Sequence, residues 1–242
     1  MCSSDLSSSM GLDELVPFKP EEKIIEYRMR SDEAKKLVSL DLEEFMNLTA
    51  SESVAPGGGS VSAYIGALGI ALGSMVANIS SHKRGWDERW DEFSAWAEKG
   101  KTIQNELLKL VDEDTNAFNM IMDAFKMPKS TDEEKKERRK AIEEATKNAI
   151  MVPFSVMETA LRSYEVIEEM VKEGNPNSVT DAGVGALAVR TCIKGAYLNV
   201  CVNTEGLKDQ QFGDEIKARA ADIVKQSDSR EKEIVEKVLG RL

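Results

Sequence analysis

The chain has 242 residues, enough for one large domain or two small ones with a substantial core. Its 43 acidic side chains outnumber its 32 basic ones, and the net charge of −11 argues against proteins that bind nucleic acid or an anionic membrane through a basic surface. Apolar residues make up 41% and charged residues 31% of the chain, a balance typical of a folded helical protein.

Cysteine and histidine are too few for several kinds of site. The three cysteines, Cys2, Cys192 and Cys201, are widely spaced, which excludes a disulfide scaffold and a thiolate zinc site. The single histidine, His82, excludes a multi-histidine centre, so we expect no metal site. Catalysis would therefore depend on carboxylates, amides, lysine, arginine or hydroxyl groups. The expected compartment is the cytoplasm, where thiols stay reduced.

The first 38 residues precede the helical pattern. Residues 1–10 are polar and serine-rich and lack the basic and apolar regions of a signal peptide, so we expect a disordered leader or an artefact. Residues 11–38 contain two prolines and are expected to form an N-terminal arm or linker. We assign residues 39–242 to one helical domain.

Apolar residues in 39–242 recur at spacings of three and four, which is typical of helices. After a first helical segment, we predict five helices, over residues 61–82, 90–125, 130–174, 178–204 and 209–242. Residues 130–133 and 178–181 fit capping boxes, and Pro153 is expected to kink or break the helix that contains it. No alternating strand pattern or long repeat is present. The predicted fold is all-α, a mostly antiparallel helix bundle with short connections.

Residues 61–79 contain no charged side chain. Their length would suffice for a membrane span, and Gly69 and Gly73 have the GxxxG spacing of membrane helix contacts. However, Gly, Ala and Ser fill much of the segment, and the rest of the chain is strongly charged. We therefore favour a central helix that is buried in the core or at an oligomer interface over a membrane contact.

The strongest break in the pattern is Pro56, Gly57, Gly58, Gly59 and Ser60. At a helix N-terminus, the unpaired N–H groups of such a turn can bind an anion or a carbonyl group. No Gly-Lys-Ser/Thr follows, so this is not a P-loop. A plain N-terminal cap with tight helix packing explains the glycines equally well.

Asp114 interrupts an apolar stripe on the helix predicted over 90–125. The stripe consists of Leu107, Val111, Phe118, Ile121 and Phe125, with Asp114 in place of one apolar residue. A carboxylate on an inward face is costly unless it has a partner, and burial would raise its pKa toward neutrality. This predicts either an acid–base residue or a buried structural partner.

Five other polar residues are candidates. Asn199 and Asn203 lie one turn apart on an apolar helix, where amides can bind a heterocycle or simply bond another helix. Asp181 belongs to the capping box predicted over residues 178–181, and capping is its simplest role. Lys83 and Arg84 follow the uncharged helix, where they could bind an anion or interact with the helix dipole.

Five segments together resemble the cyclodeaminase domain of formimidoyltransferase-cyclodeaminase and the related bacterial methenyltetrahydrofolate cyclohydrolases. They are APGGGSVSAYIGALGIALGSMV (55–76), LVDEDTNAF (110–118), MPKSTDEEKKERRKA (127–141), GNPNSVTDAGVGA (174–186) and GAYLNVCVN (195–203). Residues 11–27 also resemble the linker that follows the transferase domains, so a formimidoyltransferase, fused or separate, is an expected partner.

The resemblance implies a helical homodimer with its site in a cleft near the interface and no prosthetic group. It implies conversion of 5-formimidoyltetrahydrofolate, in polyglutamylated form, to 5,10-methenyltetrahydrofolate and ammonia, in histidine degradation and one-carbon metabolism. The family's catalytic aspartate falls on Asp114 and its glycine-rich turn on residues 57–60, with Pro56 beside it. Asp181, Asn199 and Asn203 fall in its other polar segments. Lys83 and Arg84 are our candidates for the anionic tail.

Two alternatives remain open. Hydrolysis of methenyltetrahydrofolate could use the same site, with water attack in place of ammonia loss. The chain could also be a non-enzymatic helical interaction module that uses the uncharged helix as a dimer face.

Overall fold

The computed structural model describes residues 36–242, which contain six α-helices, three short 3-10 helices and no strand. The α-helices are α4 (Leu42–Thr49), α5 (Gly58–Ser81), α6 (Trp90–Lys126), α7 (Asp132–Glu173), α8 (Val179–Thr204) and α9 (Gln210–Leu239). The prediction of an all-α fold is confirmed. The expectations for residues 1–35, the leader and most of the arm, lie outside the described residues.

The chain divides into two compact units, residues 1–45 and residues 46–242. In the first unit, the described residues form a 3-10 helix (Leu37–Ser39) and the start of α4. Asp41 begins α4, because its Oδ1 accepts a hydrogen bond from the Glu44 N–H at 2.7 Å.

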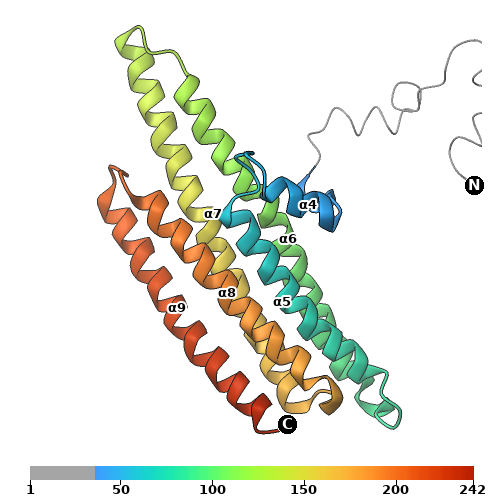
Figure 1. Ribbon diagram of the computed structural model, residues 1–242. Helices are drawn as coiled ribbons and strands as arrows, with labels where there is room; N and C mark the ends of the chain where they lie inside the picture. The colour runs from blue at the N-terminus through green and yellow to red at the C-terminus, as the bar shows by residue number, and fades with distance from the viewer. Residues whose placement is uncertain (1–35) are drawn as a thin grey trace, which may run out of the picture. The chain divides into compact units, whose positions relative to one another are not determined.

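The second unit is an antiparallel bundle of the five long helices (Figure 1). Helix α5 packs against α6, α7 and α8, and α9 covers α7 and α8. The two longest helices, α6 and α7, form a hairpin that extends past the beginning of α5 (Figure 1). The difference in helix length therefore leaves part of this hairpin without α5 as a neighbour.

Helix α5 is the uncharged helix of the sequence. Among the described helices it is the one that is long and apolar enough to cross a membrane, and 61% of its most apolar window is buried in the bundle. A core helix passes this test of length and composition as readily as a membrane span. Its position between three other helices accounts for the lack of charge.

Small residues bring α5 and α8 into close contact. A Cβ added at Gly69 would lie 2.8 Å from the Gly185 carbonyl oxygen, and one added at Gly185 would lie 2.7 Å from the Gly69 oxygen. One turn earlier on α5, a Cβ at Gly66 would lie 2.6 Å from Cys192 Sγ. The backbones of the two helices can approach this closely only because both positions are glycine.

The helix termini differ from the prediction in three places. Helix α5 begins at Gly58 and not near residue 61, so two glycines lie inside its first turn. The capping box of α7 is formed by Thr131 and Glu134, one residue later than predicted. Ser178 makes no side-chain cap on α8; the Asn175 side chain instead accepts a bond from the Asn177 N–H in the preceding 3-10 turn.

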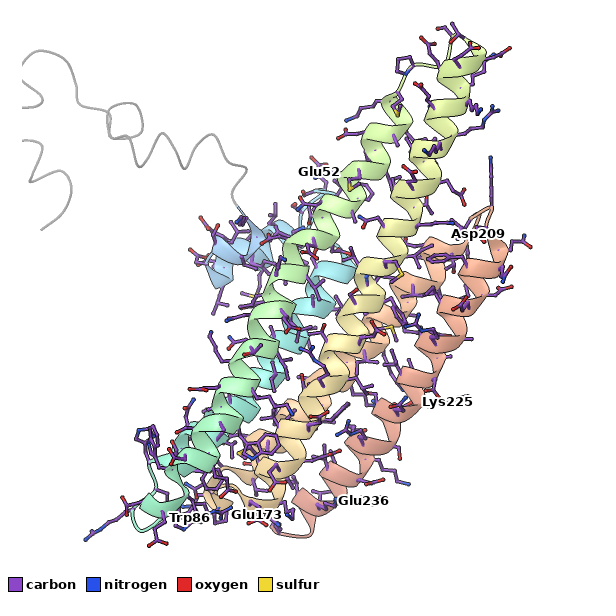
Figure 2. The ribbon with its side chains drawn as sticks, turned by 180° about the vertical axis from the view of Figure 1, so that it is seen from behind. Glu52, Trp86, Glu173, Asp209, Lys225 and Glu236 are labelled. Atoms are coloured by element: carbon purple, nitrogen blue, oxygen red, sulfur yellow. The ribbon has the colours of Figure 1, made fainter. Side chains whose placement is uncertain are left out.

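Pro153 and Asp209 were also expected to affect the helices that contain or follow them. Pro153 lies within α7, which runs unbroken from Asp132 to Glu173, so the expected break is absent. Asp209 begins α9 as predicted, since its side chain accepts from the Phe212 N–H. Its carboxylate also pairs with Lys147 of α7 at 2.5 Å, which ties α9 to the bundle. Figure 2 labels Asp209 at this end of α9.

The contact between α5 and α8 predicts that Gly69→Ala destabilises the protein by about 1–3 kcal/mol, since the new methyl group would overpack against backbone atoms. Gly213→Ala on α9 is the matched control, because its nearest neighbour would be 3.6 Å away and the helix propensity of alanine is higher. Urea unfolding measures both. Equal effects of the two substitutions would contradict this account of the contact.

Candidate functional site

Asp114 lies about two thirds of the way along α6, beside the first turn of α5. Its Oδ2 accepts two hydrogen bonds from Ser60, one from the backbone N–H at 2.8 Å and one from the hydroxyl at 2.9 Å. Gly57 is the N-cap of α5 and has no side chain that could accept these bonds. Asp114 therefore caps α5 from a different helix.

Gly59 makes this arrangement possible. A Cβ at Gly59 would lie 2.2 Å from Asp114 Oδ1 and 2.6 Å from its Cγ, whereas one at Gly58 would lie 3.5 Å from Asn199 Nδ2. Neither glycine has a positive φ. The glycine at position 59 is therefore required by the close approach of a carboxylate and not by a turn.

A cavity of about 140 Å³ opens beside this carboxylate. Its walls come from the glycine turn and from α6, α7 and α8. The lining residues are Val54, Ala55, Gly57, Gly58, Gly59, Asp114, Thr115, Ala117, Phe118, Ile121, Ala149, Asn199 and Asn203.

Two amides form the α8 side of the cavity. Asn199 Nδ2 donates to the Gly195 carbonyl at 2.9 Å, and Asn203 Nδ2 donates to the Ala149 carbonyl at 2.7 Å. These bonds to the backbone fix the orientation of both side chains. The oxygen of each amide remains available to accept a hydrogen bond from a ligand N–H group.

Burial raises the pKa of the Asp114 carboxyl above its ordinary value, and the two hydrogen bonds from Ser60 act in the opposite direction. No other residue that lines the described cavity is ionisable. The carboxyl group consequently takes up a proton more readily than an exposed aspartate does. This property suits a group that accepts and returns a proton.

The structure brings together six of the residues singled out in the sequence: Gly57, Gly58, Gly59, Asp114, Asn199 and Asn203. Pro56 and Ser60 are buried next to them but do not line the cavity. The Ser60 hydroxyl is turned toward Asp114, so its observed contact is with the carboxylate.

Three other predicted site residues lie far from this cavity within the same chain. Lys83 and Arg84 follow the C-terminal end of α5, which is 24 residues and about 36 Å long. Asp181 lies in the first turn of α8, about 27 Å of helix from Asn199. Spacing along a helix could not show that these residues belong to the opposite end of the bundle.

The sequence analysis missed several lining residues. Thr115 follows Asp114, and its hydroxyl lies 3.4 Å from Ser60 Oγ. Phe118 and Ile121 belong to the apolar stripe and were expected to be core residues, yet both line the cavity. Ala149 had no signal, since a small residue on α7 is indistinguishable from any other packing position.

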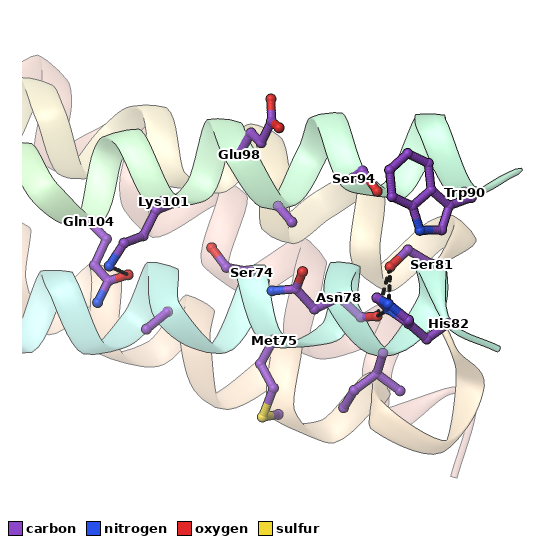
Figure 3. A pocket seen from close by; sticks show the side chains of 13 residues that line it. Ser74, Met75, Asn78, Ser81, His82, Trp90, Ser94, Glu98, Lys101 and Gln104 are labelled. Atoms are coloured by element: carbon purple, nitrogen blue, oxygen red, sulfur yellow. Dashed lines mark hydrogen bonds between the residues drawn. The ribbon is translucent and has the colours of Figure 1, made fainter.

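A larger cavity of about 820 Å³ lies between α5 and α6, toward the other end of α5 (Figure 3). Several of its polar groups bond one another: His82 Nδ1 contacts the Asn78 carbonyl and Ser81 Oγ at 2.9 Å each, and Lys101 donates to Gln104 at 3.3 Å. The smaller cavity is the better candidate site, because its carboxylate, Asp114, is partly buried and held by Ser60 at the beginning of α5.

This fold and site define a class of helical protein in which one partly buried aspartate caps the central helix beside a small cavity. The sequence model of the formiminotransferase-cyclodeaminase family matches residues 41–222. The chain therefore belongs to the formiminotransferase-cyclodeaminase family.

Individual relatives agree with this. The chain is 34% identical over 219 residues to a formimidoyltransferase-cyclodeaminase of Rattus norvegicus, an alignment that covers 90% of this chain and 40% of the relative. It is 36% identical over 174 residues to a methenyltetrahydrofolate cyclohydrolase of Methylorubrum extorquens, covering 72% of this chain and 84% of that protein. The chain thus spans about 40% of the length of the bifunctional relatives it matches.

A solved structure has a similar fold. The crystal structure of a formiminotetrahydrofolate cyclodeaminase from Thermotoga maritima aligns with a TM-score of 0.68 and 25% sequence identity. The alignment covers 84% of this chain and 96% of that one.

The close approach of Asp114 to Gly59 predicts a strong coupling between the two positions. Gly59→Ala would push the carboxylate off Ser60 and cost about 1–3 kcal/mol of unfolding free energy. In an Asp114→Ala background the obstacle is gone, and the same substitution is expected to cost little. Urea unfolding of the double-mutant cycle measures the coupling, with Gly58→Ala as the uncrowded control. Additive effects would show that the two residues do not meet.

Proposed function

We propose that the protein is a formimidoyltetrahydrofolate cyclodeaminase, which converts 5-formimidoyltetrahydrofolate to 5,10-methenyltetrahydrofolate and ammonia. One observation carries the proposal: Asp114 is the ionisable group beside the described cavity, and Ser60 holds its Oδ2 while Oδ1 has no hydrogen-bond partner among the described residues. Family membership and the name of the Thermotoga maritima protein support the same activity.

The proposed chemistry needs one proton carrier. The formimidoyl carbon on N5 is an amidinium electrophile, and N10 attacks it to form a new N10–C bond. Asp114 accepts the proton that N10 loses and returns it to the formimidoyl nitrogen, which leaves as ammonia when its C–N bond breaks. The carboxylate is then an anion again, beside the cationic methenyl product. The rigid cavity contributes by holding N10 against the carbon.

Methenyltetrahydrofolate cyclohydrolase remains the second candidate, because the relative from Methylorubrum extorquens carries that name and is matched over most of its length. In that reaction water attacks the methenyl carbon, and Asp114 accepts a proton from the water. The C–N5 bond then breaks as the hydroxyl group becomes the formyl carbonyl on N10; N5 keeps the electron pair and takes the proton back from Asp114, and the hydroxyl proton is released to solvent. A purely non-enzymatic helical module is less well supported, because the relatives are named as enzymes.

The test adds enzymatically prepared 5-formimidoyltetrahydrofolate and follows methenyl absorbance and ammonia release together. We expect both in equal amounts from the wild type, and a loss of at least about a hundredfold in Asp114→Asn, which cannot carry the proton. The variant should stay folded, since an asparagine Oδ1 still accepts from Ser60. Methenyl formation by Asp114→Asn near the wild-type rate would remove this assignment. Hydrolysis of methenyltetrahydrofolate without ammonia release would favour the cyclohydrolase.

Ser60 is proposed as a positioning residue that acts through Asp114. Its two hydrogen bonds favour the ionised carboxylate, so loss of the hydroxyl in Ser60→Ala should raise the pKa of Asp114 further. Because the ionised form accepts the N10 proton, the acid limb of kcat/KM should move to higher pH. We expect a loss of about tenfold at low pH, within the range of a hydrogen bond to a charged group, and partial recovery at high pH.

Ser62→Ala is the matched control for this experiment. Ser62 lies on the same first turns of α5 and is also buried, but its hydroxyl donates to the Gly58 carbonyl of its own helix. The pH profile of Ser62→Ala should therefore coincide with that of the wild type. An equal loss at every pH in Ser60→Ala would mean that Ser60 serves the fold and not the charge of Asp114.

We also propose a homodimer that associates through the outer face of α5 and α8. Large apolar side chains are exposed along both helices, among them Leu68 and Met75 on α5 and Leu187 and Leu198 on α8. Exposed apolar side chains on two helices that pack against each other can form an interface. Light scattering of the purified protein measures the mass.

The two described cysteines, Cys192 and Cys201, are free thiols, which fits the proposed cytoplasmic location.

The bifunctional relatives suggest the wider setting. We propose that the chain works with a formimidoyltransferase, fused or separate, that supplies 5-formimidoyltetrahydrofolate in histidine degradation. Tetrahydrofolate derivatives are then its substrates, and no prosthetic group takes part in the steps above.

A further inference from the structure

The stripe that contains Asp114 continues along α6 beyond the cavity as exposed aromatic surface. Phe118 and Phe125 lie about 6 Å and about 17 Å farther along the helix axis, on the same face as Asp114. The two residues are 38% and 51% exposed. Helix α5 begins beside Asp114 and does not cover this part of the α6–α7 hairpin (Figure 1).

The cavity is too small for the whole proposed substrate. Its volume is about 140 Å³, whereas pockets that enclose drug-sized ligands measure about 300–1,000 Å³. In tetrahydrofolate the reacting atom N10 is bonded directly to the aryl ring of the p-aminobenzoyl group. If N10 lies at Asp114, that ring must leave the cavity next to the carboxylate, where Phe118 forms both the cavity wall and the start of the exposed stripe.

A positive charge marks the far end of the stripe. Arg138 of α7 donates from Nη2 and Nε to the Phe125 carbonyl at 3.1 Å and 3.3 Å, and its guanidinium carbon lies 5.6 Å from the centre of the Phe125 ring. Along the α6–α7 hairpin, the order is thus the Asp114 carboxylate, the aromatic surface and the Arg138 guanidinium. A folate has the matching order beyond its reacting atoms: N10, aryl ring, glutamate carboxylates.

We propose that Phe118, Phe125 and Arg138 bind the p-aminobenzoylglutamate part of the substrate. This inference rests on the proposed function. It moves the site of the glutamate tail from Lys83 and Arg84, which lie at the opposite end of α5 in the same chain, to the α6–α7 hairpin. The aryl ring packs on the phenylalanine side chains, and the first or second glutamate meets Arg138.

The test measures kcat and KM for 5-formimidoyltetrahydrofolate in Phe125→Ser and Arg138→Gln, both outside the cavity. We expect KM to rise about tenfold in each and kcat to stay within about twofold, because the lost contacts do not involve the reacting atoms. Met120→Ser is the control for Phe125→Ser, since Met120 is 52% exposed and lies about 140° around α6 from Phe125. Arg139→Gln is the control for Arg138→Gln, since Arg139 is exposed. Both controls should keep the wild-type KM.

A fragment gives a second readout that does not depend on turnover. p-Aminobenzoylglutamate, which lacks the pterin, should inhibit the wild type competitively and the two control variants equally well. Inhibition should weaken about tenfold in Phe125→Ser and Arg138→Gln. Light scattering of each variant shows whether its oligomeric state has changed.

The outcomes separate this inference from the proposed function. A wild-type protein that neither forms methenyltetrahydrofolate nor binds folates would overturn both. Wild-type turnover with an unchanged KM and unchanged fragment inhibition in Phe125→Ser and Arg138→Gln would overturn the binding surface alone. A lower molecular mass of Phe125→Ser, together with lost activity, would also overturn it and would assign the stripe to a contact between chains.

Discussion

The hydrogen-bonded contact between Asp114 and the first turn of α5 is the interaction on which the site and the centre of the fold both depend. Without it, the Ser60 N–H and hydroxyl would be buried without this acceptor, and the carboxylate would be a partly buried charge without a partner. The contact also fixes the register of α6 against α5. Gly59 follows from it, because no larger residue leaves room for the carboxylate.

The same contact sets the electrostatics. Burial opposes the charge of Asp114, whereas the Ser60 hydrogen bonds and the positive end of the α5 dipole favour it. No basic side chain lines the described cavity, so no ion pair holds the carboxylate permanently ionised. A group balanced between burial and neutral hydrogen bonds can gain and lose a proton during a reaction more easily than one paired with arginine.

Features that depend on the spacing of residues along one helix could be predicted from the sequence. Features that depend on where a neighbouring helix begins or ends could not. The spacing of apolar residues identified every long helix, and the interruption of one stripe identified Asp114. The stripe did not reveal that Phe118 and Phe125 are exposed, because periodicity does not show where the neighbouring helix begins. The separation of Lys83 and Asp181 from Asp114 has the same cause. Ser178 was predicted as a cap from its residue type, but Asn175 makes the local bond instead.

Because α5 is shorter than the α6–α7 hairpin, the hairpin has two regions. One lies beside α5, and the other extends past its beginning. The part of α6 that precedes Asp114 packs against α5 and α7, so a substitution there disturbs the core. The overhanging part of the hairpin packs mainly on itself, and its length and side chains can change during evolution at little cost to the rest of the bundle. Asp114 lies at the border of the two regions, so on our proposals the reacting group and the surface that binds the rest of the substrate could be selected almost independently.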